Sequence, residues 1–125
     1  MAINYPVAEM ADRYTIARLK FERIQSNERF RFSAEMDIYF EELDKYEELN
    51  PFLERLFESN GKIWDLETEI RRGALEDKGF AWIGERAIAI RDENRVRVGI
   101  KGEIVDHYGE GFKDMKCNYS GGDEE

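Results

Sequence analysis

The chain has 125 residues, of which 42% are hydrophobic and 38% charged, and its formal net charge is −9. This length predicts one domain, and the share of apolar and aromatic residues excludes a disordered chain. The acidic balance argues against a general nucleic-acid or anionic-membrane partner, because phosphate groups are bound by basic surfaces.

The first half of the chain predicts two helices. Apolar residues at helical spacing indicate a helix from about Val7 to Gln25, with Pro6 at its first turn. Its second face carries Glu9 and Asp12 among apolar residues, so we expect that face to pack as well. A second helix follows Asn27, a plausible N-cap. Its apolar residues repeat at steps of four and three, the spacing of helical bundles: Phe32, Met36, Tyr39, Leu43 and Tyr46.

The second half predicts two longer helices. Asn50 and Pro51 form a favourable helix start, since Asn suits the N-cap and Pro the first helical position. This third helix is expected to reach about Arg72 and to end at Gly73. After a short link, a fourth helix is predicted over about 80–108.

The predicted fold is therefore all-α. We expect a single helical domain over residues 1–119, an antiparallel bundle of about four helices or two packed helical hairpins, with a short C-terminal segment. Residues 120–125 are expected to form a disordered acidic tail. With one cysteine, no signal peptide and no long apolar run, we expect a cytoplasmic protein with no disulfide.

Polar residues interrupt the apolar faces of the predicted helices, and burying them unpaired would cost several kcal/mol each. The set carries both signs: Glu9, Asp12, Glu67, Lys20, Arg97, Lys101, Asn60 and Asn94. They form either an internal ion-pair and hydrogen-bond network or a pocket for a small charged ligand or metal. A third alternative is that the helices are rotated about their axes relative to this prediction, so that some of these residues are solvated. We expect four of them to lie mostly out of water on facing sides of the third and fourth helices: Asn60, Glu67, Asn94 and Arg97.

Three segments carry a resemblance to a known family. They are Glu9-x-x-Asp12-Arg13-x-Thr15-Ile16 with Lys20-x-Glu22-Arg23-Ile24, then Asn60-x-x-Ile63-Trp64-Asp65-x-Glu67 with Ile70-Arg71, and then Ala87-x-x-Ile90-Arg91 with Asn94-x-x-Arg97 and Lys101. On these residues the chain resembles an uncharacterised all-helical family, a domain of unknown function, of bacteria and tailed phages, with the greatest likeness to phage members. The resemblance implies a helical fold in which the three segments belong together, and a phage-encoded protein of the host cytoplasm. It assigns no activity.

A non-catalytic binding or interaction protein is the leading functional prediction. It would capture a small anionic ligand, such as a nucleotide or sugar phosphate, or a partner protein through a helical face. Arg97 and Lys101 would receive phosphate oxygens, and the two asparagines would contact hydroxyl or base atoms. The candidate ligand-binding residues are Asn60, Trp64, Glu67, Asn94, Arg97, Lys101 and Lys20.

Two alternatives remain. Helical nucleotide pyrophosphohydrolases hold magnesium with paired carboxylates on adjacent helices, and Glu9-x-x-Asp12 matches half of that pattern. Glu67 would join these two acids as a metal ligand under this alternative, and no cofactor is otherwise expected. The other alternative is a purely structural protein with a buried ion-pair network. Neither His107 nor Cys117 has a partner that would indicate nucleophilic catalysis.

The second helix also predicts self-association. It places more aromatic area on its surface than one neighbouring helix easily covers, and such excess apolar surface usually marks an interface. We therefore expect a homodimer through these residues: Phe30, Phe32, Tyr39, Phe40 and Tyr46.

Overall fold

Four α-helices make up most of the computed structural model, which describes residues 5–110. They are α1 (Val7–Arg23), α2 (Arg29–Leu43), α3 (Asn50–Leu75) and α4 (Phe80–Tyr108). No strand occurs within the described residues, which confirms the predicted all-α fold. The expected domain end at residue 119 and the expected acidic tail, residues 120–125, lie outside them.

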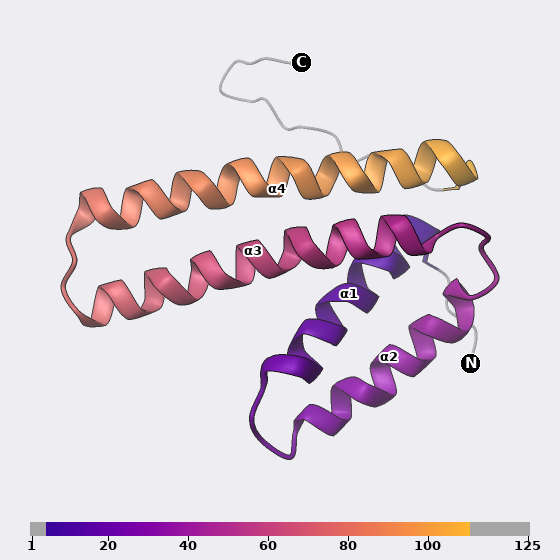
Figure 1. The fold of residues 1–125 in the computed structure, drawn as a ribbon, viewed down its shortest axis with the longest axis horizontal. Coiled ribbons are helices and arrows are strands. Elements are labelled where there is room, and N and C mark those ends of the chain that lie inside the picture. Colours follow the sequence, from indigo (N-terminus) through magenta and orange to yellow (C-terminus); the bar gives the residue numbers. More distant parts are fainter. Residues whose placement is uncertain (1–4, 111–125) are drawn as a thin grey trace.

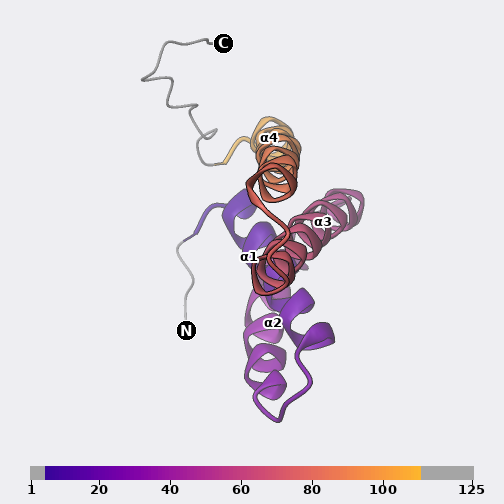
Figure 2. The ribbon, with the colours of Figure 1, turned by 90° about the vertical axis from the view of Figure 1, so that its left-hand side faces the viewer.

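The helices form two hairpins of unequal length (Figure 1). α3 and α4 lie side by side along the long axis of the molecule, and the shorter α1–α2 hairpin packs against one half of that pair. Seen end-on, α1 lies between α2 and the α3–α4 pair (Figure 2). Among the four helices, α2 packs closely along α1 alone. The molecule is thus two packed helical hairpins, one of the two arrangements that the sequence predicts.

α1 is the central helix, because it contacts each of the other three. Its buried residues lie on more than one face: Val7, Ala8, Met10, Ala11, Asp12, Thr15, Ala17 and Leu19. The prediction that its second face also packs is confirmed by the burial of Asp12 and Leu19. A polar group on that face therefore needs a partner inside the protein.

The hydrophobic core lies at the end of the molecule where the two hairpins meet. It joins the first half of α1 to the end of α2, the start of α3 and the end of α4: Val7, Ala8, Met10, Ala11, Tyr39, Leu43, Leu49, Leu53, Leu56, Ile100 and Ile104. Full burial of each large aliphatic side chain contributes roughly 1.5–3 kcal/mol. This end therefore holds the two hairpins together.

Gly73 does not end the third helix as expected, because α3 continues to Leu75. A Cβ atom built on Gly73 would overlap the indole ring of Trp82 on α4. The missing side chain thus serves the close approach of α4 rather than helix termination. The predicted asparagine caps are also wrong by one residue, since the residues before α2 and α3 are Glu28 and Leu49 and neither makes a side-chain cap.

Away from the hydrophobic core, α3 and α4 continue as a two-helix arm, defined here as residues 62–75 and 80–95 (Figure 1). Gly73 is the only buried residue that the structure describes between 62 and 99. At the tip, Leu75 and Phe80 are 90% and 94% exposed. The arm therefore carries apolar side chains without a core of its own.

No helix within residues 5–110 is both long and apolar enough to cross a membrane.

Candidate functional site

Seven polar side chains meet where α1 crosses the α3–α4 hairpin. This polar network consists of Glu9, Asp12 and Thr15 on α1, Asn60 on α3, and Asn94, Arg97 and Lys101 on α4. Each of the three segments that carry the family resemblance contributes to it. The second segment contributes only Asn60.

Asp12 lies at the centre of the polar network and is only 5% exposed. Arg97 Nη1 donates to Asp12 Oδ2 at 2.7 Å, and Asn60 Nδ2 donates to Asp12 Oδ1 at 3.0 Å. Asn60 Nδ2 also donates to Thr15 Oγ1 at 2.9 Å, and that hydroxyl donates to the backbone carbonyl of Asp12 at 2.8 Å. On the outer side, Arg97 Nε donates to Asn94 Oδ1 at 3.0 Å. Both carboxylate oxygens of the buried acid therefore have donors.

Glu9 and Lys101 form a second ion pair of the network. Lys101 Nζ lies 3.3 Å from Glu9 Oε1, and Arg13 Nε lies 3.0 Å from the other carboxylate oxygen. The Lys101 side chain is 11% exposed and the Glu9 side chain 35%. Glu9 thus shares its charge between an inner cation on α4 and an outer cation on its own helix.

Each acid of the polar network therefore contacts a base directly. This arrangement favours the internal ion-pair network among the interpretations that the sequence leaves open. Anion capture by Arg97 and Lys101 would require both cations to exchange carboxylate partners for ligand oxygens. Leaving Asp12 unpaired in its buried position would carry a large desolvation penalty.

Two residues that we expected to be buried are exposed, Glu67 and Asn94, so that prediction is wrong for them. The reason is the end of α1 at Arg23, which contacts α3 only as far as Trp64 and Asp65, while α1 contacts α4 only as far as Arg97. Asn60 is buried and Arg97 is half-buried, as predicted.

Trp64 and Lys20 also lie outside the polar network. Trp64 is half-buried, and the guanidinium of Arg23 lies 5.9 Å from its ring centroid. Lys20 Nζ lies 5.3 Å from the ring centroid of Phe32 on α2. Of the seven candidate ligand-binding residues, the network contains Asn60, Asn94, Arg97 and Lys101.

The structure does not bring together the carboxylates of the magnesium alternative. Within residues 5–110, no three acidic, histidine or cysteine side chains gather closely enough to hold a metal ion. Glu9 and Asp12 contact the cations Lys101 and Arg97, and Glu67 is exposed on the arm.

Two buried hydroxyl residues were missed by the sequence-based candidates. Thr15 is fully buried in the polar network, and its position three residues after Asp12 on the same helical face was a usable signal. Ser59 is also buried, and its hydroxyl donates to Glu93 Oε2 at 2.7 Å, which links α3 to α4. The sequence holds no comparable signal for Ser59.

The face of the α3–α4 hairpin that binds α1 continues past the end of α1. On α4, a line of residues at steps of four and three runs from Lys101 and Arg97, which contact α1, toward the tip. On α3, the corresponding line starts at Asn60, which also contacts α1. We call this continuation the open face: Trp64, Glu67, Arg71 and Leu75 on α3, and Ile83, Ala87, Ile90 and Asn94 on α4. Trp64 is its edge, because Arg23 at the end of α1 lies next to the indole ring. None of these eight residues is buried.

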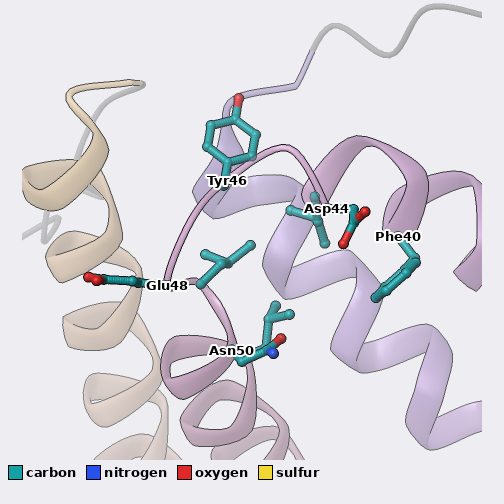
Figure 3. Close-up of a pocket in the computed structure, with 8 residues that line it drawn as sticks. Phe40, Asp44, Tyr46, Glu48 and Asn50 are labelled. Carbon is teal, nitrogen blue, oxygen red and sulfur yellow. The ribbon is translucent and has the colours of Figure 1, made fainter.

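A hollow of about 160 Å³ lies away from the network, between the end of α2 and the start of α3 (Figure 3). It is lined by Phe40, Leu43, Asp44, Tyr46, Glu48, Leu49, Asn50 and Leu53. In Figure 3, Glu48 extends toward α4, away from Asp44 and Phe40. Burial raises the pKa of Tyr46 to about 12, and the hydrogen bond of its hydroxyl with Glu110 adds to the shift.

A second hollow of about 250 Å³ lies at the tip of the arm, next to Phe80 and Ile83. Neither hollow is lined by Arg97 or Lys101. These two cavities therefore offer an anion no route to the cations of the polar network.

Comparison with protein-family models, curated proteins and solved structures finds no match for this chain.

Proposed function

We propose that this chain is a non-catalytic protein-interaction module in which the polar network locks α1 in place and the open face docks a helix of a partner protein. The observation that carries the proposal is the continuation of the α1-binding face beyond α1. α1 has 17 residues and α4 has 29, which correspond to about 26 Å and 44 Å of helix. One short helix therefore leaves much of this face uncovered, and a second helix fits the same surface.

The apolar content of the arm supports the same proposal. Isolated helices in water are marginal and take most of their stability from packing of an apolar face. Between residues 62 and 95 the chain has five isoleucines and both tryptophans, yet only Gly73 is buried there. Exposed apolar surface of this extent usually marks a binding site.

The anionic-ligand branch of the original prediction receives less support. Its two cations, Arg97 and Lys101, already pair with Asp12 and Glu9. The resemblance to phage proteins adds the further proposal that the module acts in the cytoplasm of an infected host cell.

Site-specific photocrosslinking tests the docking surface. A benzophenone amino acid placed at Ala87 lies on the open face, and one placed at the adjacent Ile88 lies about 100° further around α4, outside that face, as a matched control. In the native cell or infected host, we expect a discrete protein adduct from Ala87 that is absent from Ile88. Equal labelling from both positions, or none from Ala87, would contradict the proposal.

A further inference from the structure

Resting on the proposed function, we infer that the partner on the open face is a second copy of this chain. The two arms pair antiparallel across a two-fold axis and form a four-helix bundle. The inference depends on a register that the structure fixes, on opposite charges that this register brings together, and on the charge and size of the arm.

The register between α3 and α4 is set by two contacts within the arm. Arg86 Nε lies 3.1 Å from Glu69 Oε1, and the ring of Trp82 lies directly over Gly73. Residues 69 and 86 are therefore at the same level along the arm. A two-fold axis that crosses α3 at the level of residue 69 also crosses α4 at the level of residue 86.

On α3, this axis places unlike residues opposite each other. Reversal about residue 69 brings Glu67 opposite Arg71 of the second copy, and the symmetry makes this ion pair twice. It also brings Trp64 next to Leu75 of the second copy, so the tip residue that is 90% exposed packs on an aromatic ring. The exposed acid of the open face and the base one turn after it thus become partners between copies.

On α4, the same axis pairs apolar residues. Reversal about the level of residue 86 brings Ile83 next to Ile90 of the second copy, and Ala87 lies near the axis. A small residue at the crossing point lets two helices approach closely, and isoleucine on either side fills the remaining space. Both helices of the open face are therefore self-complementary in one register.

The charge of the arm is compatible with self-association, although the whole chain carries −9. Residues 62–95 contain eight acidic and seven basic residues, so the arm is nearly neutral. Two copies repel each other least when they approach through their arms.

The size of the open face indicates a weak, reversible dimer. About 13 residues of each helix overlap in this register, which gives a footprint of roughly 20 Å by 20 Å. That is about 400 Å² per copy and about 800 Å² in total before side chains interdigitate, at the low end of specific interfaces.

Charge exchange tests the inference in the purified full-length chain by sedimentation velocity up to several hundred micromolar. We expect the parent to dimerise reversibly, and both Glu67→Arg and Arg71→Glu to weaken the dimer at least about tenfold. An equimolar mixture of the two variants should recover the dimer, because each chain then meets opposite charges. Circular dichroism of each variant checks that the helices are intact.

The matched control is Phe30→Ser, at an exposed aromatic of α2, where the sequence alone predicts the interface. We expect this variant to dimerise like the parent. A monomeric parent, a mixture that stays monomeric, or disruption by Phe30→Ser instead of Glu67→Arg would each overturn the inference. The mass of the Ala87 crosslink separates the two proposals, because an adduct with a different protein leaves the docking surface in place and excludes the second copy.

Discussion

Replacing Arg97 by methionine tests how far the fold depends on the polar network. Methionine keeps much of the apolar stem and removes only the guanidinium that donates to Asp12 at 2.7 Å. Asp12 then keeps the amide of Asn60 as a donor but loses the guanidinium as its charge partner in a position that is 5% exposed. A buried carboxylate without a charge partner destabilises the folded protein.

The magnitude follows from the burial of the two partners. Breaking a buried ion pair by removing one member costs about 3 to 5 kcal/mol. The Arg97 side chain is 21% exposed, so water can reach the vacated position and we expect the lower end, about 3 kcal/mol. For a domain of this size, 1 kcal/mol shifts the melting temperature by roughly 4 to 5 °C. The expected fall for Arg97→Met is therefore about 12 to 15 °C.

Thermal and urea unfolding followed by circular dichroism measure this change. Arg95→Met is the matched control, because its side chain is 60% exposed on the same helix, and its effect should stay within about 0.5 kcal/mol. Adding Asp12→Asn to Arg97→Met should cost less than the sum of the single changes, since the pair is coupled. An Arg97→Met protein that melts within about 2 °C of the parent would refute the structural account and return Arg97 to the ligand-binding candidates.

Two further predictions concern local packing and pH. Gly73→Ala should destabilise by about 1–3 kcal/mol because the methyl group meets the ring of Trp82, whereas Gly84→Ala, with open space around it, should stabilise by about 0.5–1 kcal/mol. Urea titration of both variants checks this pair, and a gain for Gly73→Ala would contradict the packing. The pKa of Tyr46 is raised to about 12, so the folded state keeps the phenol proton above pH 10, where the unfolded chain loses it. The stability that this shift contributes is therefore fully present below pH 10 and is lost as pH rises through 12. Tyr46→Phe should remove a step near pH 12 from the ultraviolet phenolate titration, and an unchanged titration would argue against the buried position.

The helices could be predicted from the sequence because each has a strong periodic pattern and clear ends. The fourth helix was predicted over about 80–108 and observed over Phe80–Tyr108, where Gly109 adopts the left-handed conformation that ends it. Gly73 was misread because a glycine has two uses, helix termination and close packing. Only the position of Trp82 on the facing helix decides between them.

The polar network was predicted in part. Helical spacing correctly placed Asn60 and Arg97 on faces turned away from water, because periodicity fixes direction around a helix axis, but both side chains contact Asp12 on α1. It does not fix how far a covering helix extends along that axis. Glu67 and Asn94 follow the same lines as their buried neighbours, and they are exposed because α1 ends before it reaches them. The pairing of Asp12 with Arg97, 85 residues apart, likewise depends on the crossing of two hairpins.

The chain has only two tryptophans, Trp64 and Trp82, and both lie on the arm. Intrinsic fluorescence therefore reports on this part of the molecule, while far-ultraviolet circular dichroism reports on all four helices together. Segments with few buried apolar contacts open locally at lower free energy than the rest of a domain. A difference between the melting temperatures from fluorescence and from circular dichroism consequently measures how independently the arm unfolds. If this difference becomes smaller at high protein concentration, the arm is stabilised by association, and no label is needed to detect it.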